Sequence, residues 1–240
     1  MRISIIVPAF NEEKLIVATL HNLQSAISPF IKLGWQTELI VCDNNSTDHT
    51  AALAREAGAI VVFESQNQIA RARNCGAASA SGDWFIFVDA DSTPSAELFA
   101  DVAAQIQSGR CVGGGSTVKL DEHSRIARLV IIWNCLSRTA RWMAGSFIFC
   151  SAAAFRETGG FSNDLFVGEE IEWSRRLKKL ARRSGKKVVV LSRHPLVTSA
   201  RKLHLYSWRD YLRFVVLNTR TLGKGAKNRD DCIPWYDGRR

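Results

Sequence analysis

Residues 84–91, which read WFIFVDAD, decide how the first half of this chain folds. The unbroken apolar run Trp84–Val88 predicts a strand that is buried on both faces of a sheet. Asp89 and Asp91 stand at its carboxyl end, where open α/β sheets bind their ligands. Because two neighbouring carboxylates repel one another, we expect a hard divalent cation beside them, either Mg²⁺ or Mn²⁺. Phosphate oxygens of a substrate would complete the ligand shell of this cation. The alternative is that either aspartate only caps the next helix.

Strand-length apolar runs alternate with amphipathic segments over residues 1–95. This alternation, with short connections, favours parallel strands joined by right-handed crossovers and a Rossmann-like sheet with helices on both faces. The predicted strands are Ile3–Val7, Glu38–Cys42, Ile60–Glu64 and Trp84–Val88, and the predicted helices are Glu12–Ser28, Thr47–Gly58 and Ile69–Ser81.

Residues 96–205 are less regular, and residues 206–240 form a basic amphipathic tail. We expect helices at Ala96–Ser108, Ile126–Met143, Ala152–Thr158 and Glu169–Ser184, and strands at Cys111–Leu120, Ser146–Ser151 and Val188–Leu191. Because no linker or change of composition divides the chain, we expect one α/β domain over residues 1–240 with a mostly parallel central sheet.

The net charge of +9 indicates an anionic partner. The excess is concentrated in Arg175–Lys187 and in the tail after Arg201. Nucleic acid, anionic lipid headgroups and phosphorylated small molecules are all compatible with this charge. For the first cluster, a solvated basic helix face is an equally good explanation.

The cysteines and the apolar segments indicate a cellular compartment. Six scattered cysteines without a CxxC pair favour free thiols in a reducing environment over a disulfide scaffold. The first apolar run is broken at Pro8, too early for a signal peptide, and the longest later candidate span, residues 127–143, contains three arginines. We therefore expect a cytoplasmic protein.

Polar residues also follow the first two predicted strands. Pro8 is expected to end the first strand, so that Pro8–Glu12 turns across the carboxyl edge of the sheet. Asn11 and Glu12 could cap a helix, but capping does not account for Asp43, which stands at the edge of the second strand. Three strand ends therefore present polar groups to one edge.

Four ordered stretches of the chain resemble the family 2 glycosyltransferases with the GT-A fold. They are ISIIVPAFNEE (residues 3–13), LIVCDNNSTDHT (39–50), ARARNCGAASASGDWFIFVDADSTP (70–94) and GGFSNDLFVGEEIEWSRRL (159–177). Each is weak alone, and their joint order makes the resemblance specific. The resemblance implies a nucleotide-binding half in residues 1–95, an acceptor and catalytic half in residues 96–205, and inverting transfer from a nucleotide sugar.

The resemblance also implies roles for individual residues. Asp43 would contact the base of the nucleotide. Asp89 and Asp91 would form the DxD signature, in which the second acid binds the metal and the first holds ribose or metal. Glu170 would be the catalytic base. The other residues expected at the nucleotide are Pro8, Ala9, Phe10, Asn11, Glu12, Arg71, Arg73, Asn74, Ala90 and Glu169.

Two positions depart from the family pattern. Gln68 stands where the family has a glycine, which leaves the conformation of that loop open, and Glu170 stands where the family has the shorter aspartate. The chemistry nevertheless fits. A cation at Asp91 would stabilise the charge on a departing diphosphate, and the Glu170 carboxylate would take the proton of the acceptor hydroxyl.

Residues late in the chain could complete the site. Arg201 could bind the diphosphate through two hydrogen bonds, and His194 or His204 could ligate the metal, although lone histidines are more often structural. Residues 206–222 could lie on a membrane surface, which would suit a lipid-linked acceptor and a peripheral location at the inner face of the membrane.

We therefore expect a metal-dependent glycosyltransferase that moves a sugar from a nucleotide-sugar donor to a hydroxyl acceptor and has no nucleic-acid partner. The first candidate for the donor is a UDP-sugar. Two other classes remain open. A sugar-phosphate nucleotidyltransferase would carry a glycine-rich basic loop after the first strand, where this chain has Pro8–Glu12. A basic membrane- or nucleic-acid-binding module without catalysis rests on the charge alone.

Overall fold

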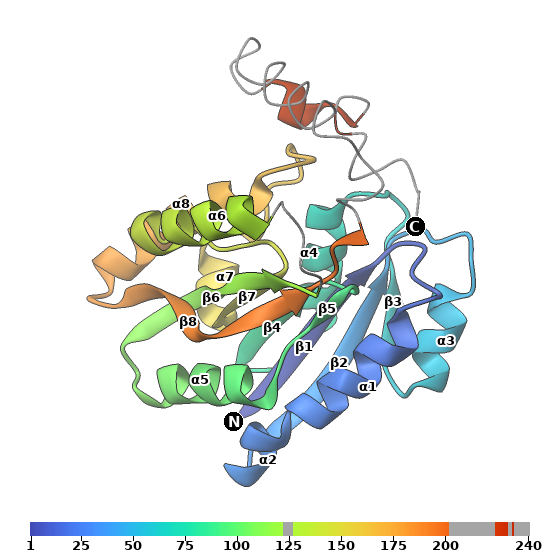
Figure 1. The fold of residues 1–240 in the computed structure, drawn as a ribbon, viewed down its shortest axis with the longest axis horizontal. Coiled ribbons are helices and arrows are strands. Elements are labelled where there is room, and N and C mark those ends of the chain that lie inside the picture. Colours follow the sequence, from blue (N-terminus) through green and yellow to red (C-terminus); the bar gives the residue numbers. More distant parts are fainter. Residues whose placement is uncertain (122–126, 202–223, 230–231, 233–240) are drawn as a thin grey trace.

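The computed structural model describes residues 1–121, 127–201, 224–229 and 232. In this part of the chain the strands form one eight-stranded sheet in the order β3-β2-β1-β4-β7-β6-β8-β5 (Figure 1). The strands are β1 (Arg2–Ala9), β2 (Gln36–Asp43), β3 (Ile60–Phe63), β4 (Trp84–Val88), β5 (Ser92–Thr93), β6 (Cys111–Leu120), β7 (Phe147–Ser151) and β8 (Lys187–Thr198).

The sheet is parallel where the sequence predicts it to be. β1 pairs in parallel with β2 and β4, and β2 pairs in parallel with β3. β7 is antiparallel to β4 and β6, whereas β6 and β8 are parallel. β8 is longer than the predicted Val188–Leu191, because its polar continuation Ser192–Pro195 gives no apolar signal. β5, which the sequence reading missed, pairs antiparallel with the end of β8.

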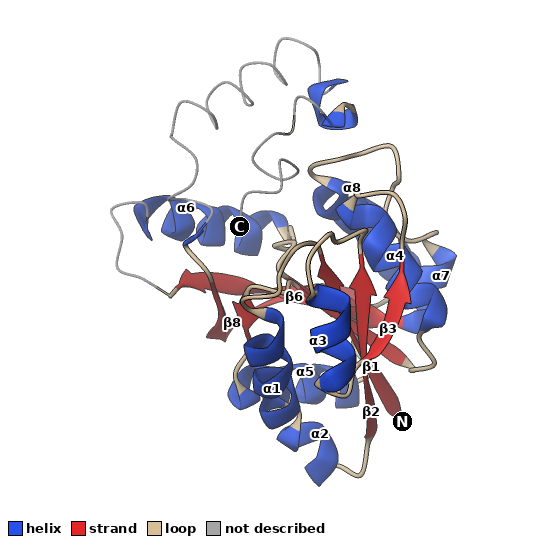
Figure 2. Cartoon of the chain, turned by 90° about the vertical axis from the view of Figure 1, so that its right-hand side faces the viewer, coloured by secondary structure: helices blue, strands red, loops and turns tan. Residues whose placement is uncertain are grey.

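Helices cover both faces of the sheet, as predicted (Figure 2). α1, α2, α3 and α5 lie on one face, and α4, α7 and α8 on the other. Their bounds are α1 (Ile16–Ala26), α2 (Ser28–Lys32), α3 (Thr50–Glu56), α4 (Ile69–Ser79), α5 (Ala96–Gln107), α6 (Ala127–Ala140), α7 (Ala152–Glu157) and α8 (Glu169–Arg183), with a short 3₁₀ helix at Lys224–Lys227.

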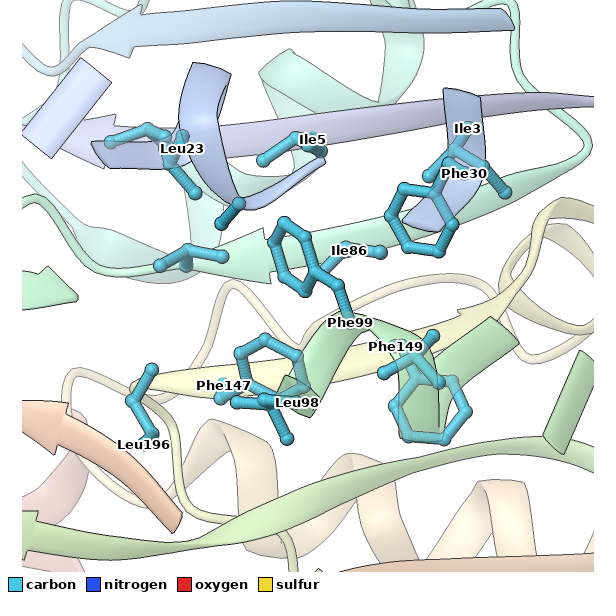
Figure 3. Packing of buried hydrophobic residues seen from close by; sticks show 14 of the residues in the cluster. Ile3, Ile5, Leu23, Phe30, Ile86, Leu98, Phe99, Phe147, Phe149 and Leu196 are labelled. Atoms are coloured by element: carbon cyan, nitrogen blue, oxygen red, sulfur yellow. The ribbon is translucent and has the colours of Figure 1, made fainter. Parts of the chain in front are cut away.

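Alternate side chains of the central strands supply two cores. Ile3 and Ile5 of β1 pack with Ile86 of β4 against the α1, α2 and α5 side, where Phe30 and Phe99 stack (Figure 3). The neighbouring positions of the same strands, Ile6, Phe85 and Phe87 among them, face α4, α7 and α8. β4 is therefore buried on both faces, which confirms the prediction from its apolar run.

Pro8 corrects one expectation, because it lies inside β1 rather than ending it. It stands opposite Cys42 of β2, and the strand continues through Ala9. β1 pairs with β4 only as far as Ile6, so no β4 residue depends on an amide hydrogen at Pro8.

The expectation of free cysteines holds within the described residues. All six are free; Cys75 is partly buried, Cys135 is exposed and the other four are buried. No helix in the described ranges combines the length and apolar character needed to cross a lipid bilayer. The tail predicted to contact a membrane, residues 206–222, lies outside the described residues.

Gly114 offers a test of the sheet. A Cβ added there would lie 2.2 Å from the carbonyl oxygen of Val189 on β8, so we expect Gly114→Ala to lower the free energy of unfolding by about 3 kcal/mol or more. Gly109 has a positive φ and no atom within 4 Å of the added Cβ, so Gly109→Ala should cost only about 1–2 kcal/mol. Equal losses in urea denaturation would contradict the tight β6–β8 contact.

Candidate active site at the carboxyl edge of the sheet

The loops after β1 and β2 are fastened to each other at this edge. Ala9 stands opposite Asp43 in the β1–β2 pairing. Asn11, with a positive φ of 53°, accepts a hydrogen bond from the Thr47 amide at 2.8 Å, and its own amide donates to the Ser46 hydroxyl at 3.0 Å. Asn11 therefore joins two loops and does not cap α1.

The ends of β1, β2 and β3 surround a cavity of about 460 Å³. Of the residues expected at the nucleotide, Phe10 lines this cavity. Asp43 lies beneath this edge, is buried and accepts a hydrogen bond from the Ser46 amide at 3.3 Å. The lining residues are Phe10, Asn45, Thr47, Ser65, Gln66, Asn67, Gln68, Phe166 and Arg229.

Arg229 is a lining residue that sequence reasoning missed. It belongs to the short described stretch 224–229, whose Ala226 carbonyl accepts a hydrogen bond from the Phe166 amide at 2.7 Å. The tail was interpreted from its charge and amphipathic pattern alone. No motif in the sequence indicated that part of it returns to the sheet edge.

Gln68, the departure from the family glycine, is a buried connector at the start of α4. Its backbone amide donates to the Asn44 side-chain oxygen at 2.8 Å, and its side-chain Nε2 donates to the backbone carbonyls of Asn163 and Leu165. Its φ of −155° is extended, so no glycine is required there. Arg71 donates to the Gln68 side chain at 3.0 Å.

Asn74 contacts the loop between α7 and α8, residues 158–168, which we call the 160s loop. Its side chain both donates to the Phe161 carbonyl and accepts from the Phe161 amide, each at 2.9 Å. Within the described part of the chain, Asn74 lines neither the cavity above nor the cleft described below. Its contacts support this loop, and its expected place at the nucleotide stays a prediction.

Arg73 is buried, with 1% of its surface exposed, and connects three segments. Its Nη1 donates to Glu169 Oε1 at 2.7 Å. Its Nη2 donates to Asp89 Oδ1 at 3.1 Å and to the Gly145 carbonyl at 2.8 Å. The guanidinium thereby joins the end of β4, the segment between α6 and β7, and the start of α8.

A cleft of about 210 Å³ opens beside this arginine. Asp89 and Glu170, which are far apart in sequence, both line it. Glu170 lies in the first turn of α8, two residues after Gly168 and its positive φ of 82°. The full lining is Ile69, Arg73, Asp89, Gly145, Ser146, Phe166, Val167, Gly168, Glu169 and Glu170. Phe166 also lines the larger cavity, so the two are neighbours.

The carboxyl groups of the cleft are electrostatically strained. Burial and, to a lesser extent, the charge of Glu170 raise the pKa of Glu169 to about 8, although Arg73 opposes the shift. Burial also raises the pKa of Glu170, against the effect of Arg73 and of the α8 amide hydrogens. The carboxyl groups of Asp89, Glu169 and Glu170 lie near a single guanidinium, that of Arg73. This cleft therefore attracts a cation or retains a proton.

The end of β8 reaches Asp91, the second acid after β4. The Ser199 amide donates to the Asp91 carbonyl at 3.1 Å, and Ser92 pairs with Thr198. Asp91 is partly exposed, whereas Ala90 is buried and its carbonyl accepts from the Thr19 hydroxyl at 2.6 Å. The two acids therefore leave the strand in different surroundings.

Arg201 follows β8 and lies at the same edge, where it binds a carboxylate. Its Nη2 donates to both oxygens of Glu12, at 3.0 and 2.9 Å. Glu12 is buried, and this pair ties the loop after β1 to the end of β8. The guanidinium that was expected to hold a diphosphate therefore already has a protein partner.

The histidines do not extend this site in the described residues. His194 Nδ1 lies 2.9 Å from Asp101 Oδ2 on α5, so its contact is with a helix on the face of the sheet. His204 lies outside the described residues.

The donor set at Asp89 and Asp91 fits a divalent cation that takes much of its shell from a substrate. No group of three or more His, Cys, Asp or Glu side chains within the described ranges is arranged to hold a metal by itself. One oxygen of Asp89 accepts from Arg73. Mg²⁺ and Mn²⁺ accept sites of one or two carboxylates completed by phosphate oxygens and water.

Glu169 gives a pH test of the buried cluster. Because its pKa is raised in the folded protein, the folded state binds more protons than the unfolded state between about pH 5 and pH 8, and stability should fall as the pH rises through this range. Glu169→Gln should reduce that fall in urea denaturation, whereas Glu157→Gln, at an exposed position of α7, should not. An unchanged pH dependence in Glu169→Gln would contradict the assignment.

The sequence of the chain matches that of known proteins over most of its length. The family described as Glycosyl transferase family 2 matches residues 4–161. The glycosyltransferase AglE of Haloferax volcanii is 24% identical over 189 residues, covering 72% of this chain and 60% of that protein. Glucosyl-3-phosphoglycerate synthase of Mycobacterium tuberculosis is 36% identical over 105 residues, or 31% of its length. The chain thus spans less than two thirds of these relatives.

Solved structures share the fold. The mannosyltransferase PcManGT from Pyrobaculum calidifontis, in complex with GDP-Man and Mn²⁺, has a TM-score of 0.67 at 22% identity over 89% of this chain and 61% of its own. The mycobacterial synthase, in complex with Mn²⁺, UDP and phosphoglyceric acid, has a TM-score of 0.61 at 22% identity over 95% of this chain and 80% of its own. These likenesses confirm the GT-A fold, and the match over residues 4–161 shows that the chain belongs to glycosyltransferase family 2.

Proposed function

We propose that this protein is a metal-dependent glycosyltransferase that moves a sugar from a nucleotide-sugar donor to a hydroxyl acceptor with inversion. The observation that carries the proposal is the Arg73 network, which holds Asp89 at 3.1 Å and Glu169 at 2.7 Å. It brings the end of β4 and the first turn of α8 to one cleft. Transfer of a sugar requires the acids after β4, on the donor side, and the glutamates of α8, on the acceptor side, to lie close together.

The cavity over β1–β3 is the proposed pocket for the nucleoside. Phe10 and Phe166 offer apolar surface to a base, and side-chain amides surround them. The Asn67 side-chain NH₂ is buried and has no hydrogen-bond partner among the described residues, so it is a suitable donor to a base carbonyl. Uracil offers carbonyls and one ring N–H, which supports a UDP-sugar as the first candidate; Asp43 would accept from that N–H.

Glu170 is the proposed base. In the transfer, the acceptor oxygen forms a bond to the anomeric carbon, the bond from that carbon to the diphosphate breaks, and the hydroxyl proton passes to the Glu170 carboxylate. The raised pKa of Glu170 suits this role, because a base accepts a proton best when its pKa approaches the working pH. Arg73 and Glu169 position the first turn of α8 that carries it.

Asp91, with Asp89, would hold the divalent cation, Mn²⁺ or Mg²⁺. When bound, such a cation stabilises negative charge on the leaving diphosphate. Arg201 remains a candidate for the same diphosphate, because its Nη2 is engaged by Glu12 while a guanidinium carries further donors. The mycobacterial relative is described with Mn²⁺ and UDP, and PcManGT with Mn²⁺ and GDP-Man, which supports metal use.

Nucleotidyl transfer is the second candidate, and it is less well supported. The segment after β1 is fixed by Asn11 against Thr47 and carries no glycine-rich basic loop. Thermal-shift screening of UDP, GDP, CDP and dTDP sugars with Mn²⁺ or Mg²⁺ tests the donor. Pyrophosphate release from a nucleoside triphosphate and a sugar phosphate would favour the second candidate. The proposed acceptor is a molecule with a free hydroxyl group, and lipid-linked acceptors belong to this class.

Glu170→Gln tests the base. We expect the variant to fold and to bind donor, and its transfer rate to fall by about 10²–10⁴-fold, because a neutral amide takes no proton. The matched control is Glu172→Gln, two residues along α8, where the carboxylate pairs instead with Arg176 at 2.8 Å. Transfer at the wild-type rate in Glu170→Gln would contradict the role.

Asp91→Asn tests the metal site. Because the described residues offer few ligands of their own, we expect Mn²⁺ to bind tightly to the wild-type protein only together with UDP, as measured by titration calorimetry. Asp91→Asn should abolish the Mn²⁺-dependent gain in UDP affinity and leave the melting temperature of the free protein nearly unchanged. A retained gain would refute this ligand.

A further inference from the structure

Helix α6 exposes an apolar face that is not part of either core formed by the described residues. Ile131, Ile132 and Leu136 are 66%, 56% and 48% exposed. The helix is held to β6, because the Asn134 side chain accepts from the Val118 amide and donates to the Val118 carbonyl, at 2.9 and 2.8 Å. The three aliphatic side chains therefore point away from the protein core.

A cluster of cations adjoins this face, contributed by α6 and α8. Arg138 shares a groove with Ile131, and Arg141 follows the helix. Lys178 of α8 donates to the Ala140 carbonyl at 2.9 Å, which fixes α8 beside the end of α6. The basic cluster consists of Arg138, Arg141, Arg175, Lys178 and Arg182.

The charges of the basic cluster are not neutralised by the described residues. None of the five ion pairs in the described ranges includes any of its members. Burial and the charges of Arg175, Arg182 and Arg141 lower the pKa of Lys178, which reflects how closely the cations are gathered. An unneutralised group of this kind calls for an anionic surface.

We propose that the α6 face and the basic cluster dock this protein on an anionic lipid bilayer. The aliphatic side chains of α6 enter the headgroup boundary, and the cations contact lipid phosphates. A nucleic acid would use the cations but would leave the three exposed aliphatic side chains without a role. A bilayer uses both, and this decides between the two partners.

The docking surface lies next to the candidate active site. Residues 141–146 lead from α6 directly into the cleft, which Gly145 and Ser146 line, and α8 begins at the cleft with Glu169 and Glu170. A bilayer on this face would stand beside the mouth of the cleft. The inference goes beyond the proposed function and is independent of which sugar is transferred.

Flotation of the full chain with vesicles tests the docking. We expect binding to phosphatidylcholine vesicles that contain phosphatidylglycerol, little binding to pure phosphatidylcholine, and release by high salt. Arg138→Gln with Arg175→Gln should weaken binding roughly thirtyfold. Ile131→Ser with Ile132→Ser and Leu136→Ser should weaken it at least tenfold.

Two control variants separate this face from general charge and hydrophobicity. Ile31→Ser with Leu33→Ser removes aliphatic side chains that are 59% and 40% exposed at α2, and Lys32→Gln with Arg55→Gln removes two charges there and at α3. Both should bind vesicles like the wild type. All variants keep residues 202–240, so undiminished binding of the α6 variants would assign the membrane contact elsewhere and overturn the proposal.

Two further outcomes would also overturn it. These are failure of the wild type to float with anionic vesicles, and binding of the basic cluster to RNA in preference to them. The stabilisation of each variant by UDP and Mn²⁺ is measured in parallel. Its retention shows that the variants fold and separates failure of the docking from failure of the proposed function.

Discussion

The buried guanidinium of Arg73 is the interaction on which the candidate site depends. Burying a charge is costly unless it is paired and hydrogen-bonded, and here two carboxylates and a carbonyl surround it. Removing one partner of such a buried pair typically costs about 3–5 kcal/mol, because the other charge is left uncompensated. The same contacts that stabilise Arg73 therefore fix the relative positions of β4 and α8.

The rest of the edge is held by side chains that join loops rather than by secondary structure. Asn11 connects the loops after β1 and β2, Gln68 connects α4 to the 160s loop, and the Arg201–Glu12 pair connects β8 to the loop after β1. The polar groups of a ligand site are held in more precise positions when the segments that carry them are fixed in this way. Several polar residues of the motifs thus also make supporting contacts within the protein.

Charge is divided between two regions of the molecule. The cleft gathers Asp89, Glu169 and Glu170 around one arginine, whereas the basic cluster lies on α6 and α8. The net charge of +9 is thus not distributed evenly. An acidic cleft suits a cation, and a cationic outer face suits an anionic surface, so the two regions carry separate roles in the proposals above.

The sequence by itself determined the alternation of strands and helices, the burial of β4 and the family, because apolar periodicity and ordered motifs are local properties. The run Trp84–Val88 became β4 without a shift of a single residue. It did not determine β5, the length of β8 or the position of Pro8 within its strand, because pairing partners distant in sequence decide these. Only the tertiary structure decided that Arg73 pairs with Glu169, that Asn74 supports a loop and that Arg229 reaches the larger cavity. A side chain's role depends on which groups surround it in space, and such groups can be distant in sequence. Asn74 bonds to Phe161, 87 positions away, and Arg73 bonds to Glu169, 96 positions away.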